Sequence, residues 1–461
     1  MGRAQTAYYH LPPLVQTVAL NAYGIRTLYR YSAWQRVLSS LKLSETWTRA
    51  QQKAYVASRL RTVISAALEG VQRYASFRHL ASQLRDTDEI VLEVLRALPP
   101  VSRQEILADP NAFMNYRRSS RRLVRSATSG TTGTPFTALL EPETMTISDA
   151  LWWRRTAWAG YRRGDWIARM VGDPVIALSD REPKRPYRLS WTDHRLYLST
   201  YHLSESTAPM IAEALVRRKP RFLMGYPSAL DAFARLTGHR LRGWQPRAVL
   251  YSSEPLYGHQ RSAIEAIVSA PIRGLYGCAE RVVSAAECDH GGLHLGLVDG
   301  FVEGQFGEAS DDPKQPPPVT GLLNTAMPLI RYELGDEVVP RPDVQCRCGR
   351  TLPVINPVIT KNEDMVVTPS GRRISASILT WAFKEAPGLL RSQVVQREDM
   401  SLDIRLQASE IDREVVERIR RLVEDITFGE LPVNVTRVAG LTLTEAGKTR
   451  FVVSRCVQRR C

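Results

Sequence analysis

A run of small and hydroxylated residues at 128–133 is the part of the sequence best suited to holding phosphate. It supplies two glycines, four side-chain hydroxyls and a row of backbone N–H groups, which together can surround phosphate oxygens at close range. No Gly-Lys-Ser/Thr sequence follows, so the run is not a Walker loop. The alternative interpretation is a polar surface turn. The residues are Thr128, Ser129, Gly130, Thr131, Thr132 and Gly133.

Three later stretches place charged groups at the ends of apolar runs. Tyr276 and Gly277 end one run in a turn that leads to the carboxylate of Glu280. A second run ends at Asp336, and near the C-terminus Lys448 follows a glycine. Taken alone, a Gly-Lys pair is usually a surface turn. Together with the run at 128–133, these stretches give four places along the chain that could do chemistry.

The spacing of cysteines and histidines predicts a metal site. Cys346 and Cys348 form a close thiol pair, and Cys288 and His294 lie upstream on the two sides of a Gly-Gly turn. Three thiolates and one imidazole form a tetrahedral set suited to Zn²⁺, with no open position for catalysis. We therefore expect a structural zinc site, with His290 as the alternative histidine ligand. The other interpretation is a group of reduced, buried thiols.

Apolar runs alternate with helical periods between residues 137 and about 300, which predicts βαβ units. The last hundred residues no longer show this alternation. Their pattern predicts a hairpin, two strands around a turn, a long amphipathic helix and a further strand. We therefore expect an α/β protein. A large N-terminal domain over 1–359 would hold mostly parallel sheets covered by helices, and a small mobile α+β domain would occupy 360–461.

The segment before these units is expected to be helical. Apolar residues recur every three and four positions over 44–96, with Ser44 or Thr46 as the candidate N-cap. Ser102 is expected to cap a further short helix.

Composition excludes several classes of protein. The chain has 461 residues, of which 44% are hydrophobic and 24% are charged, as in ordinary globular proteins and unlike disordered or collagen-like chains. No apolar run approaches the roughly 18 residues of a membrane span, and the N-terminus does not resemble a secretory signal. Six cysteines are too few for a disulfide framework. These observations favour a cytoplasmic protein.

The charge balance is strongly basic. The 62 basic and 47 acidic residues give a net charge of +15. This excess fits a polyanionic partner, or anionic substrates such as nucleotides and coenzyme A, but it also fits a solvated surface encoded by an arginine-rich codon usage. The densest clusters, such as Arg154-Arg155 and Arg217-Arg218, are short. A nucleic-acid partner is therefore not expected.

The four chemistry-bearing stretches, in this order, resemble the adenylate-forming superfamily of acyl-CoA synthetases and related enzymes. Within it the chain is similar to the phenylacetate–CoA ligase-like branch, and most of all to its CapK-like members. The resemblance covers nearly the whole chain. Supporting stretches are LPPVSRQEIL before the phosphate-holding run, MGYPSAL at 224–230, SSEPL at 252–256, ECDHGGLH at 287–294 and CRCGR at 346–350.

The resemblance implies a role for each matched position. Residues 128–133 would hold the ATP phosphates, and Glu280 would help to bind Mg²⁺. Tyr276 and Gly277 would lie where the adenine and acyl pockets meet, and Asp336 would accept hydrogen bonds from the ribose. Lys448 would contact the carboxylate and the α-phosphate during adenylation.

The acyl pocket and the hinge are also implied. The walls of the acyl pocket would include Tyr226, Ser252 and Ser253. Two positions depart from the family pattern. Phe136 stands where many members have lysine, and Thr360-Lys361 stands at the hinge where the family has Gly-Arg. Lys361 keeps the positive charge of the arginine without its fork geometry.

The implied activity is ATP-dependent activation of a small carboxylic acid to an acyl-adenylate, followed by transfer of the acyl group to a thiol. The thiol would be coenzyme A or a carrier-protein arm. One alternative is transfer to an amine or hydroxyl acceptor in polysaccharide or natural-product biosynthesis. Another is a basic binding protein that no longer catalyses the reaction. The implied cofactors are ATP, Mg²⁺, a structural Zn²⁺ and coenzyme A.

Overall fold

The computed structural model describes most of the chain. The described residues are 8–9, 11–118, 123–127, 137–172, 175–177, 180, 182–237, 241–308, 316–358, 365–374, 376–383, 386, 389–408, 410–441 and 451–456.

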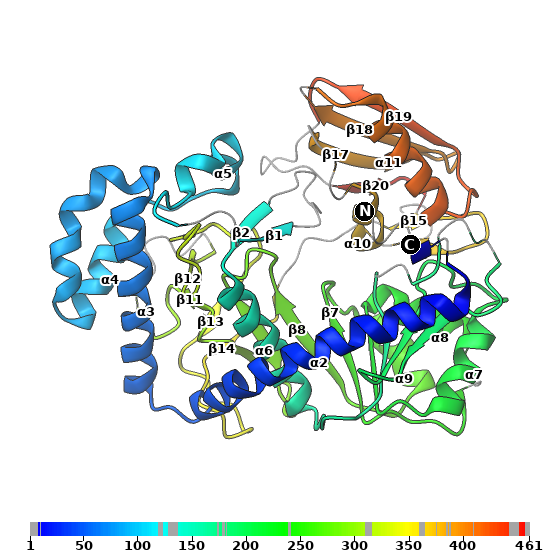
Figure 1. Ribbon diagram of the computed structural model, residues 1–461, viewed down its shortest axis with the longest axis horizontal. Coiled ribbons are helices and arrows are strands. Elements are labelled where there is room, and N and C mark those ends of the chain that lie inside the picture. Colours follow the sequence, from blue (N-terminus) through cyan, green and yellow to red (C-terminus); the bar gives the residue numbers. More distant parts are fainter. Residues whose placement is uncertain are drawn as a thin grey trace.

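A ten-stranded sheet forms the centre of the molecule (Figure 1). Its strand order is β13-β14-β10-β9-β8-β7-β6-β3-β5-β4. The five strands from β8 to β5 run parallel, and antiparallel strands flank them on both sides. The strands are β3 (Ile167–Met170), β4 (Tyr187–Ser190), β5 (Arg195–Leu198), β6 (Phe222–Gly225), β7 (Ala248–Ser252), β8 (Ile272–Gly277), β9 (Ser284–Glu287), β10 (Leu293–Leu295), β13 (Pro340–Arg341) and β14 (Val354–Ile355).

Crossover helices connect the central parallel strands, as the alternating pattern predicts. They are α7 (Ala208–Arg218), α8 (Pro227–Thr237) and α9 (Gly258–Ile267). All residues of β6 are buried, which explains why that strand reads as a continuous apolar run rather than as an alternating one. Leu215, Phe233 and Ile264 from the three helices join one core with the strands. The α/β fold class with a mostly parallel, helix-covered sheet is confirmed.

Two long helices and several short ones precede the sheet. They are α2 (Pro13–Ser44), α3 (Arg49–Gly70), η1 (Gln72–Arg85), α4 (Asp88–Ala97), α5 (Arg103–Ala108), η2 (Pro110–Phe113) and α6 (Pro142–Trp158). The expected N-cap at Ser44 or Thr46 is wrong, because α2 continues through Ser44. Thr48 caps α3 instead: its hydroxyl accepts from the Gln51 N–H, and its own N–H donates to Gln51 Oε1 at 2.8 Å. Ser102 caps α5 as expected.

Two small two-stranded sheets complete this part of the chain. One pairs β1 (Val124–Ala127) with β2 (Thr137–Leu140), and the other pairs β11 (Gly300–Val302) with β12 (Val319–Gly321). Apolar residues of β2, β11 and β12 enter the core that α3 and α4 form with β9 and β10.

The C-terminal residues form a separate four-stranded sheet of order β19-β18-β17-β20. The elements from residue 365 onward are β15 (Val366–Val367), β16 (Arg373–Ile374), α10 (Ala376–Leu379), η5 (Thr380–Phe383), β17 (Leu389–Gln396), β18 (Leu402–Ala408), α11 (Arg413–Ile426), β19 (Val433–Val438) and β20 (Val452–Ser454). The expected hairpin is β15–β16, and the expected strand pair, helix and final strand are β17–β18, α11 and β19. We call residues 365–456 the C-terminal unit; the expected boundary at 359/360 lies outside the described residues.

The C-terminal unit has its own apolar core, which includes Val394, Ile404 and Val423. Tyr201, from the segment after β5, is buried in that same core, and its ring lies 6.1 Å from that of Trp381. The C-terminal unit therefore packs on the large sheet through apolar contacts, and Figure 1 shows it above the ends of β7 and β8.

The chain contains no described helix that is both long and apolar enough to span a bilayer.

Candidate active site

The described residues that were predicted for nucleotide and acyl binding lie at one edge of the large sheet. Strands β6, β7 and β8 are parallel neighbours, so their carboxyl ends meet at the same edge. Tyr226 follows β6, Ser252 ends β7, and Tyr276 and Gly277 end β8. In open α/β sheets, ligands bind outside the carboxyl ends of the strands. The topology therefore gathers residues that are about fifty positions apart in sequence.

Asp336 lies beside the end of β8. The Tyr276 hydroxyl donates a hydrogen bond to Asp336 Oδ2 at 2.9 Å, although the two residues are 60 positions apart. Glu280 lies on the turn after β8 and is 5% exposed; Tyr332 donates to its Oε1 at 3.1 Å. Two tyrosines thus hold the two predicted carboxylates.

Burial and negative charge determine the electrostatics around Tyr276. Its pKa is raised well above the usual 10.0, first by burial and then by the nearby charges of Asp336, Cys278 and Glu280. The phenol therefore stays protonated and remains a hydrogen-bond donor. The charges of both carboxylates raise the pKa of the same phenol, so Glu280 and Asp336 both lie near the Tyr276 side chain. Burial, followed by the charge of Glu280, raises the pKa of Cys278 to about 12, so this thiol is not a nucleophile.

The expected acyl-pocket residues are also at this edge. Tyr226 and Ser252 are half-buried, whereas Ser253 is exposed. Ser253 has φ of +72°, in the left-handed region, so the chain turns sharply as it leaves β7. Tyr226 packs against both the core of the large sheet and the core of the C-terminal unit. Tyr226 therefore contacts both parts of the molecule.

Sequence reasoning missed two residues that position this edge. The carboxylate of Glu254 accepts from the Ser228 N–H and hydroxyl, both at 3.0 Å, and so holds the first turn of α8 against the end of β7. Arg155 was counted in a short basic cluster expected at the surface, but it is 1% exposed and donates to the Tyr251 carbonyl at 2.8 Å. Burial lowers the pKa of Arg155 to about 9. No sequence signal distinguishes such a residue from a surface arginine.

Several predicted residues lie outside the described part of the chain. They are the phosphate-holding run Thr128–Gly133, Phe136, the hinge residues Thr360 and Lys361, and the C-terminal Lys448. Their roles remain predictions from the resemblance. The described neighbours of the first run are β1 and β2, which pair antiparallel on its two sides.

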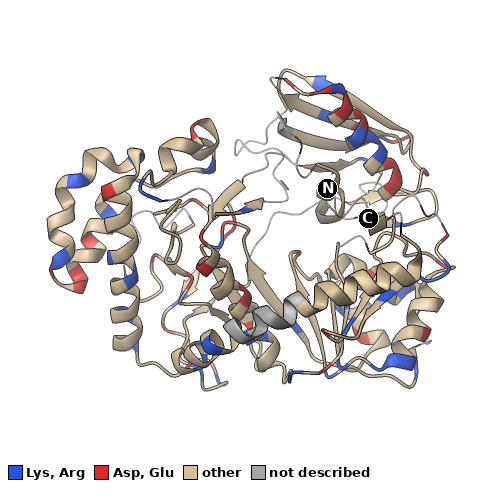
Figure 2. Cartoon of the chain, viewed as in Figure 1, with Lys and Arg blue, Asp and Glu red and all other residues tan. Residues whose placement is uncertain are grey.

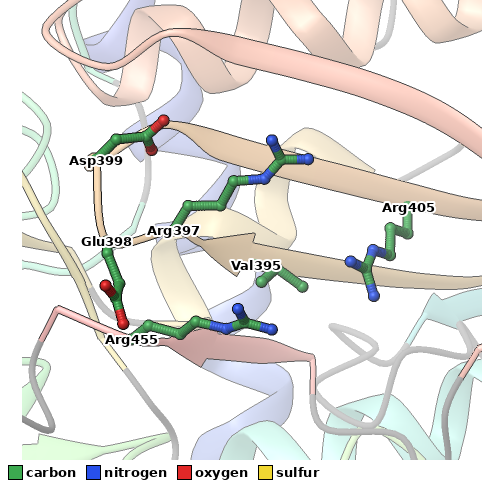
Figure 3. A pocket seen from close by; sticks show the side chains of 6 residues that line it. All are labelled: Val395, Arg397, Glu398, Asp399, Arg405 and Arg455. Atoms are coloured by element: carbon green, nitrogen blue, oxygen red, sulfur yellow. The ribbon is translucent and has the colours of Figure 1, made fainter.

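A separate basic pocket lies on the C-terminal unit (Figure 3). It measures ≈ 380 Å³ and is lined by Val395, Arg397, Glu398, Asp399, Arg405 and Arg455. Arg397 and Arg405 both pair with the buried Asp403, at 3.4 and 3.0 Å. Figure 3 shows the guanidinium groups of the three arginines on the two sides of Val395. None of the residues predicted from sequence lines this pocket.

The four predicted metal ligands come together at another place. The ligand atoms of Cys288, His294, Cys346 and Cys348 all lie within 4.8 Å of one another. The Sγ atoms of Cys288 and Cys346 are 3.5 Å apart, and Cys348 Sγ is 3.3 Å from His294 Nε2. His294 Nδ1 lies 2.9 Å from the Leu352 carbonyl, so it acts as the donor and leaves Nε2 free as a ligand atom.

The surroundings of this cluster fit a metal ion. A Cβ on Gly292 would lie 2.7 Å from Cys346 Sγ, so only glycine leaves room for the four ligands. His290, the alternative ligand, is exposed and faces Asp289 at 3.6 Å. The geometry thus selects His294. Three thiols and one imidazole nitrogen within this distance suit tetrahedral Zn²⁺.

The cluster lies away from the carboxyl edge. Its ligands come from the β9–β10 turn (Cys288), from β10 (His294) and from the loop before β14 (Cys346 and Cys348). Strand β9 runs antiparallel to β8, and Gly277 pairs with Ser284 at the site end. Cys288 is four residues further along, roughly 13 Å at 3.3 Å per residue. A metal here would join two loops rather than contact a ligand at the active site.

The fold was compared with known proteins. No protein-family model matches the chain. Solved structures of 2-hydroxyisobutyryl-CoA ligase in complex with 2-HIB-AMP and CoA align over nearly the whole chain. The open conformation gives a TM-score of 0.52 at 20% identity and covers 89% of this chain and 93% of that one. The thioesterification state gives 0.53 at 20% identity, with 90% and 93% covered.

The chain has the fold of the adenylate-forming superfamily. Protein CapK of Staphylococcus aureus is 21% identical over 377 residues, which cover 79% of this chain and 81% of that protein. The predicted resemblance to the superfamily is confirmed. At these identities the likeness establishes the fold, and the chemistry depends on the residues that this chain places at the carboxyl edge.

Proposed function

We propose that this protein activates a carboxylic acid with ATP and forms an acyl-adenylate. The observation that carries the proposal is the pair of carboxylates, Glu280 and Asp336, held by Tyr332 and Tyr276 at the carboxyl edge of a sheet with the superfamily fold. A carboxylate is a poor electrophile, so it needs a leaving group before it can be transferred. Attack of the substrate carboxylate on the α-phosphorus of ATP forms the mixed anhydride and releases pyrophosphate.

Each residue at the carboxyl edge would bind a different part of the nucleotide or its metal ion. Asp336 accepts hydrogen bonds from the ribose hydroxyls, and the Tyr276 phenol fixes the orientation of that carboxylate. Glu280 is the carboxylate for Mg²⁺, which would neutralise charge on the departing pyrophosphate. From outside the described residues, 128–133 would contribute N–H and hydroxyl donors to the phosphates. Lys448 would stabilise the charge that gathers during transfer.

We assign the two parts of the chain to domains 1–359 and 360–461. Tyr201 and Tyr226 already contact the C-terminal core, so the smaller domain closes over the edge where the acid and ATP would meet. Closure excludes water, which would otherwise hydrolyse the adenylate. None of the five described cysteines is in a disulfide, which agrees with a cytoplasmic location.

A thiol is the proposed acceptor in the second step. Coenzyme A is a polyanion, and the pocket with Arg397, Arg405 and Arg455 offers cations for its phosphates. Pantetheine carries the same thiol without the nucleotide. Arg455→Ala should therefore raise the KM for coenzyme A and leave the KM for pantetheine unchanged. Equal effects on both thiols would argue against this site, and product formed with amines but not with thiols would favour the amide-forming alternative.

Pyrophosphate exchange into ATP across a panel of carboxylic acids tests the first step. We expect acid-dependent exchange that Asp336→Asn reduces through the KM for ATP. The matched control is Asp289→Asn, an exposed aspartate on the β9–β10 turn. Bound ATP without exchange for any acid would refute the proposal. Such a result, together with tight and strongly salt-dependent binding of nucleic acid, would instead favour the basic binding protein.

We further propose that Cys288, His294, Cys346 and Cys348 hold a structural Zn²⁺. A four-coordinate site of this kind leaves no position for substrate. Its effect would be to tie the β9–β10 turn to the loop before β14, and so to hold the strands next to β8 in register.

A further inference from the structure

The first part of α2 exposes an apolar face to solvent. Leu14, Val15, Val18 and Ile25 are 78%, 43%, 67% and 60% exposed, and Ala22 between them is exposed as well. At 3.6 residues per turn these five positions fall within an arc of about 100° on one side of the helix. We call this set the α2 stripe. An ordinary surface helix would turn such a stripe toward the core.

Polar residues opposite the stripe (Gln16) and at its edge (Asn21) hold the helix against the protein. Gln16 is 3% exposed, and its Oε1 accepts two hydrogen bonds from the Arg188 guanidinium, at 2.9 and 2.7 Å. Asn21 Oδ1 accepts from the Trp191 N–H at 2.7 Å, and its amide donates to the Leu189 carbonyl at 3.3 Å. These bonds to β4 fix the rotation of the helix about its axis, so the stripe cannot turn inward without breaking them.

The close packing of Gly24 supports the same orientation. A Cβ on Gly24 would lie 2.1 Å from the Thr192 hydroxyl, which means that the helix touches the β4–β5 turn directly at this point. The second part of α2 behaves differently, because Trp34 and Leu41 are buried against Leu151 and Trp153 of α6. Near the end of the helix, Leu43 is again exposed, at 68%.

The charged residues of α2 itself are all basic. Residues 8–44 contain no aspartate or glutamate, whereas α2 alone contains Arg26, Arg30, Arg36 and Lys42. Figure 2 accordingly shows no acidic residue on the described part of this helix. Beside it, Trp191 is 52% exposed, and the Arg218 guanidinium lies 4.5 Å from the centre of its ring. Exposed apolar residues, an exposed tryptophan and nearby cations are the features of helices that lie in a membrane interface.

We propose that the α2 stripe lies on an anionic membrane surface. The apolar side chains would enter the boundary between headgroups and acyl chains, and Arg36 and Lys42 of the same helix would attract the anionic headgroups. A second copy of the chain fits this face less well, because each copy carries a net charge of +15 and the two helices would bring only positive side chains together. Association along one face of α2 needs no spanning segment.

Flotation with lipid vesicles tests the proposal. The full-length protein is mixed with vesicles of phosphatidylcholine alone, or of phosphatidylcholine with phosphatidylglycerol, and centrifuged through a density step. We expect flotation with the anionic vesicles only. The double variant Leu14→Gln with Val18→Gln should bind these vesicles about tenfold more weakly or worse, because two apolar side chains no longer leave water. Tyr116→Gln, at a 68% exposed position distant from α2 in the fold, is the matched control and should bind like the wild type.

The other outcomes overturn the proposal. Absence of flotation at low salt would refute it directly. Equal flotation of the wild type and the double variant would show that net charge alone attracts the protein, and that the stripe has no part in binding. A dimer that the double variant converts to a monomer, without vesicle binding, would assign the stripe to contact between copies. Both exchanged positions are exposed, so the melting temperature should not change, and its measurement separates loss of binding from loss of fold.

Discussion

Replacing Cys346 by serine should remove the metal that we propose for the Cys/His cluster. The substitution takes away one of four ligand atoms that lie within 4.8 Å of one another. It is nearly isosteric, and a serine hydroxyl does not ionise at neutral pH to replace the thiolate as a zinc ligand. We therefore expect the wild type to contain one zinc ion per chain and the variant to contain much less.

The sequence separation of the ligands sets the size of the effect. Cys288 and Cys346 are 58 residues apart, so a metal that joins them closes a loop of that length. Treated as a cross-link in the unfolded chain, closure of such a loop stabilises the folded state by about 4 kcal/mol. For a chain of this size the loss should lower the melting temperature by roughly 4 °C.

Metal analysis and scanning calorimetry on the same samples provide the assay. Cys456→Ser is the control, because this thiol lies beside the Arg397 carbonyl on the C-terminal unit and outside the cluster. Pyrophosphate exchange well below the melting temperature should be kept by both variants, since the cluster is away from the carboxyl edge. A wild-type protein that holds no metal when purified with added zinc would refute the reasoning. So would a Cys346→Ser variant with unchanged melting.

Three further predictions concern other parts of the structure. Gly292→Ala should weaken zinc binding about tenfold or more in competition with a chelator, because its Cβ would lie 2.7 Å from Cys346 Sγ; unchanged affinity would contradict the geometry. Tyr276→Phe should raise the KM for ATP roughly tenfold with little change in kcat, since it removes the hydrogen bond that orients Asp336; a change in kcat alone would not fit that role. Burial lowers the pKa of His202 from 6.5 to about 4, so the unfolded chain gains a proton there before the folded one does. The contribution of His202 to the free energy of unfolding is fully present above pH 6.5 and falls by about 1.4 kcal/mol per pH unit from 6.5 down to 4. In urea titrations, His202→Gln should abolish this part of the pH dependence.

Local patterns in the sequence were sufficient to predict the strands and helices of the large sheet and of the C-terminal unit. Strands β6, β7 and β8 are short apolar runs bounded by glycine or proline, and the helices between them have the period of an amphipathic helix. Such signals are contained within each segment, so no long-range contact is needed to read them. The start of α3 was placed wrongly because Ser44, Thr46 and Thr48 are all acceptable caps, and only the end of α2 excludes the first two.

Pairings across the chain could not be read in the same way. Tyr276 and Asp336, and likewise Tyr332 and Glu280, are 60 and 52 positions apart, and no spacing rule links a phenol to a carboxylate at that distance. Arg155 has the sequence context of a surface arginine. Its burial depends on where α6 packs, since that decides which residues of the helix face β7.

By itself the sequence determined the α/β fold class and indicated the candidate metal-binding residues and the position of the candidate nucleotide carboxylates along the chain, because residue types and short periods carry that information. Tertiary structure decided which histidine joins the three cysteines, which groups hold Glu280 and Asp336, and which side of α2 faces water. The physical reason is the same in each case. Burial and hydrogen bonding depend on what lies opposite a residue, and the residue opposite comes from a distant part of the chain.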